Sequence, residues 1–293
     1  MAETTSGSLS GALPSIVADA RIVKEFEGTW QRTCDVKKQK AGTGLYWTEY
    51  SLNQLTAQDI TETTDNRNYQ TLSGSLQSIE PTMSQIIIKI TDRTYRKIAD
   101  VVEGKFGSLT GNAMARKEDE DYLSLFSGFA TGASPGTGNP LGHGSIAAAA
   151  RRVTSNVTEP SMSEVYSVLH GFQIYDIQAE LTAGIGTYTL QPGMTEEVYR
   201  KGFRGDVASS HVFEDGNITV DSTPDANGAT HAKEGVIAVI GMEIKTEKDR
   251  DMYFGGGADV LSLVSEYAFA ERQSGSTQVW AWRHFSDSTA PTS

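Results

Sequence analysis

The sequence has 293 residues, of which 38% are hydrophobic and 21% charged, which is enough to bury a sizeable core as one elaborate domain or two smaller ones. Its formal net charge of −12 speaks against a protein whose main task is to grip nucleic acid. It contains no run of about 18 apolar residues that would span a membrane, and its first residues lack the order of a secretory signal, so we expect synthesis in the cytoplasm.

The N-terminal residues 1–12 are mainly Ser, Thr, Gly and Ala, and we expect them to form a mobile arm. From Pro14 to Gly28, apolar residues recur at three- and four-residue steps: Ile16, Val17, Ala20, Val23 and Phe26. This spacing predicts an amphipathic helix with Pro in its first turn. The stretch from Arg21 to Lys40, which includes Lys37 and Lys38, carries six basic and three acidic residues. Its local charge of +3 is opposite in sign to that of the whole chain.

Residues 44–52 and 83–91 are rich in aromatic and β-branched residues, which predicts two strands. Between them, Asn53 to Pro81 is polar, with few candidates for burial: Leu55, Ile60, Tyr69, Leu72, Leu76 and Ile79. A connection of about 28 residues is too long for an ordinary loop. The stretch is therefore either disordered or an extended hairpin that finds its partner on another molecule.

A long helix is predicted from Tyr95 to Phe126. Its apolar stripe, which the charged run Arg116 to Asp121 interrupts, consists of Ile98, Val102, Phe106, Leu109, Ala113, Met114, Leu123 and Phe126. At 1.5 Å per residue the helix would span about 45 Å, which is longer than a compact domain needs. Its length suggests a spar, although Gly104, Gly107 and Gly111 each lower its stability by about 1 kcal/mol relative to Ala.

Residues 127–144 predict a linker because Gly, Pro and Ser dominate them, and beyond this linker the pattern becomes mixed α/β. We expect helices at Ser145–Val153 and Phe172–Leu181, and strands at Val165–Leu169, Val236–Ile244, Val260–Phe269 and Val279–Trp282. A hairpin is predicted in which Val212-Phe213 and Ile218–Val220 flank Asp215-Gly216. A loop is expected at Asn227-Gly228 and a turn at Gly255–Gly257.

The search for a catalytic or metal site is mostly negative. The five His residues are scattered, and no nucleophile elbow, P-loop or dinucleotide fingerprint occurs. Cys34 is the only cysteine, and we interpret it as a packing thiol. The carboxylates from Glu118 to Asp121 could bind a divalent cation or act as acid and base, but we favour a solvated or intersubunit helix face paired with Arg116 and Lys117. We therefore expect no cofactor, no metal and no enzymatic activity.

Three segments carry a resemblance to a known family. The run from Leu109 to Leu123 (LTGNAMARKEDEDYL) is followed by the strand pattern Val165 to His170, and then by Lys201 to Gly205 leading into Val212 to Glu214. They look like the spine helix, an axial-domain strand with its helix, and the approach to the next strand in one group of tailed-phage major capsid proteins. The chain resembles this family, the Hong Kong 97 type, over about residues 10–285, through the order and spacing of its parts. Encapsulins share the fold.

The resemblance implies an α+β capsid fold with an N-terminal arm, an extended β-hairpin loop, a long spine helix, and peripheral and axial domains. It divides the chain into the arm at 1–40, the extended loop at 41–91, the spine helix and peripheral domain at 92–138, the axial domain at 139–241, the returning peripheral strands at 242–272, and the closing axial strand and tail at 273–293. The expected intersubunit contacts are Ile60, Tyr69, Leu72 and Leu76 in the loop, Ile16, Val23 and Phe26 in the arm, and Lys37 and Lys38 at its end.

The implied function is that of a major capsid protein whose hexamers and pentamers form the icosahedral virion shell around double-stranded phage DNA. Expected partners are further copies of the chain, a separate scaffold protein and a portal protein, with a decoration protein as a further candidate and only weak, non-specific contact with DNA. Some relatives lock their shells by joining a loop Lys to an Asn of another subunit, but residues 53–81 contain no Lys, so we expect no such crosslink at the loop tip. An encapsulin shell, another virion component and a soluble hydrolase or binding enzyme remain as alternatives.

Overall fold

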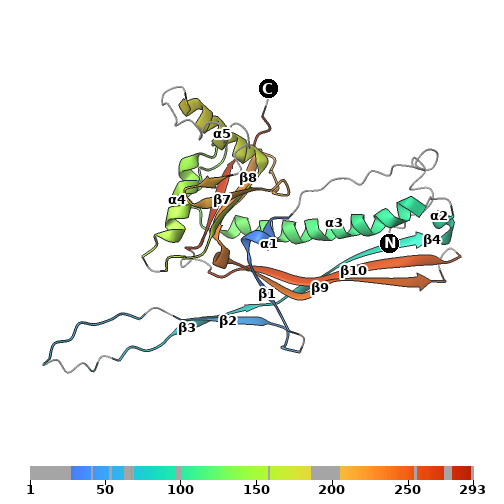
Figure 1. Ribbon diagram of the computed structural model, residues 1–293, viewed down its shortest axis with the longest axis horizontal. Coiled ribbons are helices and arrows are strands. Elements are labelled where there is room, and N and C mark those ends of the chain that lie inside the picture. Colours follow the sequence, from blue (N-terminus) through green and yellow to red (C-terminus); the bar gives the residue numbers. More distant parts are fainter. Residues whose placement is uncertain are drawn as a thin grey trace.

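The computed structural model describes residues 28–40, 42–52, 55–62, 67, 69–96, 100–157, 159–185, 205–253, 256–273 and 279–291. Within these residues the chain forms a long four-stranded sheet with a long helix along it, a five-stranded sheet with two helices, and a thin two-stranded hairpin that projects away from both (Figure 1). The fold is therefore α+β and extended, as the sequence predicted.

The four-stranded sheet has the order β1-β9-β10-β4. Its strands are β1 (Asp35–Lys38), β9 (Val236–Asp251), β10 (Ala258–Glu271) and β4 (Thr82–Thr91). Strands β9 and β10 are antiparallel neighbours, and the turn between them includes Gly256 and Gly257 at φ values of 86° and 113°. Only glycine adopts such angles without strain, so the predicted glycine turn is confirmed at these two positions.

The predicted long helix is confirmed with different ends. A short α2 (Asp92–Tyr95) precedes α3 (Asp100–Ser124), which passes into the single 3-10 turn η2 (Leu125–Gly128). Helix α3 lies along one face of the four-stranded sheet (Figure 1). There the Ser265 hydroxyl donates to the sulfur of buried Met114 at 3.4 Å, and the Tyr267 hydroxyl donates to Asp121 at 2.7 Å.

The five-stranded sheet has the order β11-β8-β5-β7-β6. Its strands are β5 (Val165–Leu169), β6 (Asp206–Val207), β7 (Ser210–Glu214), β8 (Asp225–Ala232) and β11 (Ala281–Asp287); the helices are α4 (His143–Thr154) and α5 (Gly171–Ile185), with the turn η3 (Lys233–Gly235). Every residue of β5 is buried, which explains why its continuous apolar pattern predicted the strand correctly. The predicted helices correspond to α4 and α5, each with shifted ends.

Two predictions in this part are wrong. The expected hairpin around Asp215-Gly216 does not form, because β7 pairs in parallel with β5 and antiparallel with β6, and residues 218–220 add only an isolated bridge from Val220 to Ala226. Asn227-Gly228 lies inside β8 rather than in a loop. A Cβ atom at Gly228 would come within 2.6 Å of Leu169 and 2.8 Å of Gln173, so this glycine serves close packing above the strand.

The predicted Gly/Pro linker, residues 127–144, is an ordered segment that is hydrogen-bonded to the edge strand β11. The amides of Arg283 and Asp287 donate to the carbonyls of Ala130 and Asn139 at 2.7 and 2.9 Å, and the amide of Gly136 donates back to Phe285 at 3.0 Å. Phe129 and Leu141, near its two ends, are buried. The segment therefore supplies packing and main-chain hydrogen bonds, and its composition reflects tight turns rather than freedom.

One apolar cluster joins the two sheets. It includes residues from α1 (Trp30–Thr33), α3, η2 and strands β5, β8, β9 and β11: Trp30, Cys34, Tyr122, Leu123, Phe126, Phe129, Val168, Ile218, Ala226, Ala229, Val236, Ala238 and Ala281. Cys34 is buried in it, as expected of a packing thiol, and burial raises the pKa of the thiol far above its usual range. Among the described residues no helix is long and apolar enough to cross a membrane.

A buried tyrosine–histidine pair links α3 to β8 inside this cluster. The Nδ1 of His231 lies 3.0 Å from the carbonyl of Ala232, so Nδ1 donates there and Nε2 accepts from the Tyr122 hydroxyl at 2.7 Å. The Tyr122 oxygen in turn accepts from Thr33 at 3.0 Å. Burial lowers the pKa of His231 to about 4, so the ring is neutral near neutral pH.

Candidate assembly surfaces

The hairpin consists of β2 (Trp47–Leu52) and β3 (Gly74–Ile79), which pair antiparallel from Trp47 opposite Ile79 to Leu52 opposite Gly74. Its root is anchored on the face of the four-stranded sheet opposite α3, where Ile79 is buried against Ile237 and Val239 and Trp47 packs beside them. Beyond the root the strands leave the body of the subunit (Figure 1). The extended hairpin predicted as one of two alternatives is thus what the chain forms.

Arg272, directly after β10, fixes the hairpin root to the rest of the subunit. Its guanidinium donates to Glu49 of β2 at 3.1 Å, to Asp35 of β1 at 2.8 Å and to the carbonyl of Glu234 at 2.7 Å. Burial would raise the pKa of Asp35, but Arg272 and Lys37 hold it below its usual value. Because the Arg272 side chain is 14% exposed, these ion pairs are better shielded from water than ordinary surface pairs.

We expect Arg272→Met to loosen the hairpin while the subunit stays folded. The change keeps the apolar stem but leaves Glu49 without its guanidinium partner, which should lower the free energy of unfolding by about 1–3 kcal/mol. Hydrogen exchange of the amides in β2 and β3 should become faster. The control is Arg250→Met at the far end of the sheet, where the half-exposed Arg250 pairs with Asp92 and Asp259, so the change should lower the free energy of unfolding much less. Equal effects of the two changes would contradict the assignment.

The hairpin carries apolar side chains that its own subunit does not cover. The four loop residues predicted as contacts are all exposed, from 64% for Leu76 to 87% for Tyr69, with Ile60 and Leu72 between these values. Further exposed apolar residues in and beside the hairpin are Leu45, Tyr46, Tyr50, Leu52 and Leu55. Sequence reasoning assigned most of these to an ordinary strand, and only the period-two alternation within β2 could have marked them as outward-facing.

Tyr50 and Leu76 form an outward apolar pair on the hairpin. They lie directly opposite each other, and Leu52 follows on the same face, whereas Trp47 and Glu49 face the subunit. The Tyr50 ring also covers Gly74, where an added Cβ would come within 2.8 Å of the ring. An isolated two-stranded hairpin is marginal in water, and exposed apolar patches of this kind mark interaction sites.

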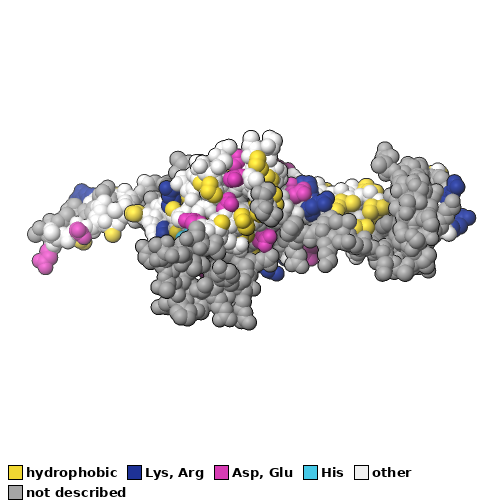
Figure 2. Space-filling view, turned by 90° about the horizontal axis from the view of Figure 1, so that it is seen from above, with side chains coloured by type: hydrophobic (Ala, Val, Ile, Leu, Met, Phe, Trp, Pro, Cys, Tyr) yellow, Lys and Arg dark blue, Asp and Glu magenta, His cyan; other side chains and the backbone are white. Residues whose placement is uncertain are grey.

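Past the strands, the two limbs of the loop remain connected across the gap. The side-chain amide of Gln70 accepts from the amide of Thr56 at 2.9 Å and donates to the carbonyl of the same residue. The side chain of Gln70 thus makes the two hydrogen bonds to the Thr56 main chain that a residue of a paired strand would make with its own main chain. Figure 2 shows the hairpin as a narrow extension with apolar and acidic side chains exposed along it. The loop therefore projects from the subunit as an ordered extension.

The remaining predicted contacts lie elsewhere. Ile16, Val23 and Phe26 lie outside the described residues. Lys37 and Lys38 are on β1, where Lys37 pairs with Asp35 at 3.1 Å and Lys38 pairs with Glu243. All nine predicted contacts stay predictions, since no second subunit is present.

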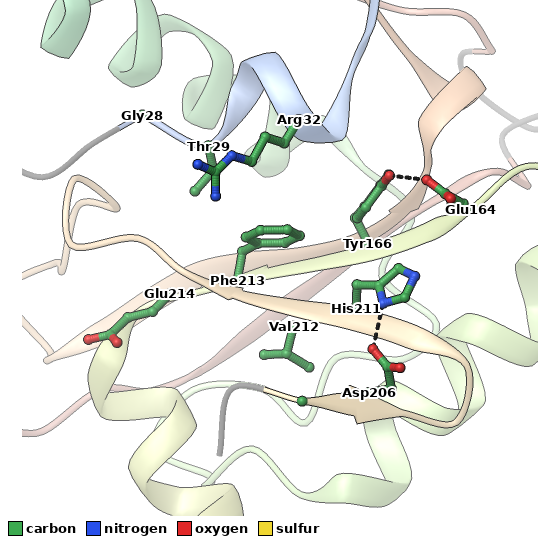
Figure 3. Close-up of a pocket in the computed structure, with 11 residues that line it drawn as sticks. Gly28, Thr29, Arg32, Glu164, Tyr166, Asp206, His211, Val212, Phe213 and Glu214 are labelled. Atoms are coloured by element: carbon green, nitrogen blue, oxygen red, sulfur yellow. Dashed lines mark hydrogen bonds and ion pairs between the residues drawn. The ribbon is translucent and has the colours of Figure 1, made fainter. Parts of the chain in front are cut away.

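A pocket of about 600 Å³ lies between α1 and the five-stranded sheet (Figure 3). Phe213, Tyr166 and His211 point into it from the sheet, and Arg32 lies over them from α1. Four of its polar groups pair with one another: His211 with Asp206, and the Tyr166 hydroxyl donates to Glu164. Burial and Glu164 raise the pKa of Tyr166 to about 12, which makes its hydroxyl a poor nucleophile.

No cluster of three or more His, Cys, Asp or Glu that could hold a metal ion occurs in the part of the chain that the structure describes. The charged run expected on a solvated helix face is partly buried: Glu118 is 8% exposed and Asp119 fully buried. The solvated-face prediction is therefore wrong for these two residues, because α3 turns them toward the sheet and the loop after β7. Glu120 and Asp121 do pair with Arg116 and Lys117 as expected.

The sequence matches no family model and no curated protein, whereas the fold has clear relatives among solved structures. A chain of Mycobacterium phage Che8 superposes with a TM-score of 0.69 at 12% identity, covering 93% of this chain and 98% of that one. The capsid of cyanophage P-SCSP1u gives 0.67 at 12%, with 98% and 96% covered, and the head of Helicobacter pylori bacteriophage KHP40 gives 0.68 at 12%, with 92% and 94% covered.

The chain has the Hong Kong 97-type capsid fold. The coverage of these phage structures is nearly complete in both directions, so the hairpin, the long helix and both sheets all belong to this capsid fold. At 12% identity the likeness to these three structures lies in the arrangement of the elements. The capsid fold was predicted from the sequence and is confirmed.

Proposed function

We propose that this chain is the major capsid protein of a tailed phage, and that its hexamers and pentamers build the icosahedral shell around double-stranded DNA. The observation that carries the proposal is the projecting hairpin with its uncovered apolar side chains on a capsid fold. Covering one such side chain with a neighbouring copy would contribute about 1.5–3 kcal/mol. A hairpin that cannot bury itself is then stabilised by the assembly it helps to form.

We propose that the chain divides into the parts that its resemblance to this family implies. We assign residues 1–40 to the arm, 41–91 to the extended loop, 92–138 and 242–272 to the peripheral domain, and 139–241 with 273–293 to the axial domain that gathers around the symmetry axes.

The net charge of −12 fits a shell that surrounds DNA without holding it tightly, since each phosphate contact would need a Lys or Arg. Scaffold, portal and decoration proteins are the further partners we propose. The role is structural, without a catalytic step.

Electron microscopy of the purified chain tests the proposal. We expect negatively stained closed particles of uniform size, or open sheets and rings of the same subunits. A clean monomer at the highest soluble concentration would argue against a shell protein. Nuclease-resistant double-stranded DNA inside particles from infected cells would distinguish a phage capsid from a cellular compartment that encloses a protein cargo.

A further inference from the structure

Two fully buried carboxyl groups meet where three separate parts of the chain join. Asp119 comes from α3, and Asp215 comes from the loop directly after β7; neither has any exposed surface. The two carboxyl groups lie within hydrogen-bonding reach of each other. The third part is the segment that begins at Gly28 and leads into α1, which passes so close to Asp119 that a Cβ on Gly28 would lie 2.9 Å from the Asp119 oxygen.

Two residues hold the pair from opposite sides. Thr29 donates its amide to Asp119 at 2.9 Å and its hydroxyl to Asp215 at 3.0 Å. Asn217 donates its side-chain amide to Asp119 and its main-chain amide to Asp215, both at 2.9 Å. Each of the four carboxyl oxygens therefore accepts one hydrogen bond from a neutral donor. These donors position the pair but do not neutralise two charges.

Among the described residues no cation compensates the pair. The ionisable groups that face the pair are Tyr122 on the same helix and Cys34 after α1, with His231 of β8 behind Tyr122. Tyr122 and Cys34 have pKa values raised by burial, and His231 has one lowered by burial, so all three are uncharged near neutral pH. No Lys, Arg or His of the described residues forms an ion pair with Asp119 or Asp215. Arg32 instead lines the surface pocket (Figure 3).

Two carboxylates this close cannot both be charged in a dry site without a large penalty, so one of them keeps its proton to unusually high pH. Burial and the neighbouring Asp119 raise the pKa of Asp215 to about 7. The titration belongs to the pair rather than to either residue alone.

We propose that Asp119 and Asp215 share one proton, and that this proton fastens the segment beginning at Gly28 and the loop after β7 to the long helix α3. We call Asp119, Asp215 and the shared proton the latch. This proposal does not depend on the proposed capsid function. In the closed latch the proton bridges two carboxyl groups. When the latch opens, water solvates both groups, and the proton is released as soon as the pH exceeds the ordinary carboxyl pKa of about 4.

The sign of the pH effect follows from this linkage. The closed state binds the proton up to about pH 7, whereas the open state loses it near pH 4. The equilibrium constant for opening therefore rises by up to about tenfold per pH unit as the pH increases from about 4 to about 7, and it stays constant above about pH 7. The latch is tightest in mild acid and weakest from neutral pH upward.

Cys34 provides the readout, since it is the only thiol in the chain and is 1% exposed directly after α1. We expect dithiodipyridine to label it only when the segment opens. The labelling rate of the full-length wild-type chain, divided at each pH by that of Asp215→Asn, should rise several-fold to tenfold per pH unit from about pH 5 and level off near pH 7. Dividing by the variant removes the intrinsic pH dependence of the thiol and of the buried histidines, which both proteins share.

Glu120→Gln is the matched control. Glu120 follows Asp119 on the same helix but is half exposed and pairs with Arg116, so this variant should keep the wild-type pH profile. If Asp215→Asn does not fold, Asn217→Ala decides the question. It removes one donor to the charged form, so the levelling-off point should move to higher pH. A wild-type profile that runs parallel to Asp215→Asn, or an unmoved levelling-off point in Asn217→Ala, would overturn the latch.

Discussion

Replacing residues 53–73 by Asn-Gly is expected to give a folded subunit that no longer closes shells. The register places Leu52 opposite Gly74, so a two-residue turn can join β2 directly to β3 without disturbing the ladder. The apolar side chains removed are exposed, so the free energy of unfolding should change by less than about 1 kcal/mol. Assembly should fail because this change removes the part of the hairpin that we propose to contact a neighbouring copy. Sedimentation velocity and negative-stain microscopy measure the outcome.

A second variant separates the length of the loop from its side chains. Changing only Leu55, Ile60, Tyr69 and Leu72 to Ser keeps the length of the loop and the Gln70–Thr56 connection. If contact through apolar area holds the copies together, this chain should assemble almost as poorly as the shortened one. Shells of normal size and yield from the shortened chain would refute the role of the hairpin.

Phe126→Ala is expected to have the largest effect on the stability of the subunit. The Phe126 ring is fully buried, with ring centroids 5.0 Å from Tyr122, 5.4 Å from Phe129 and 6.2 Å from His231. Truncating a buried Phe lowers the free energy of unfolding by about 3–5 kcal/mol, which is a large part of the roughly 5–15 kcal/mol that a domain has. Urea unfolding should show a much lower midpoint.

The comparison for Phe126 is Leu109→Ala on α3, the long helix that leads into the turn η2 where Phe126 lies. Leu109 is 39% exposed, so its truncation should change the free energy of unfolding by about 0.5 kcal/mol. Phe126 lies where α3 ends and both sheets meet, so its loss should also lower the cooperativity of unfolding between them. Similar midpoints for the two variants would show that the shared core is less important than its packing suggests.

Elements whose own residues are apolar and buried could be predicted from the sequence. Elements that are held in place by pairing with a partner strand could not. Strand β5 was predicted with its correct ends because every residue in it is apolar or small and buried. Strand β9 was expected to end at Ile244 but continues to Asp251, through exposed polar residues that remain in a strand only because β10 lies beside them. Strand pairing of this kind overrides local propensity, and one sequence does not reveal it.

The same distinction holds for the functional surfaces. Tyr69 and Leu72 stood out because a long polar stretch with a few apolar residues has no interior of its own, and the structure leaves both exposed. Asp119 gave no such signal: within a run of charges it looks like a solvated residue. Its partners Thr29 and Asn217 lie 90 and 98 positions away, so only the folded chain reveals its burial.

Only Glu80 and Pro81 separate β3, the returning strand of the hairpin, from β4, an edge strand of the four-stranded sheet. Proline has a fixed φ and therefore adds little freedom at this joint. A pull on the tip of the hairpin would thus travel along covalent main chain into ten consecutive pairs between β4 and β10, loading them in shear. Because many hydrogen bonds resist shear together, such a pull in the proposed shell should disrupt the hairpin's proposed contacts with a neighbouring copy before it separates the strands of this sheet.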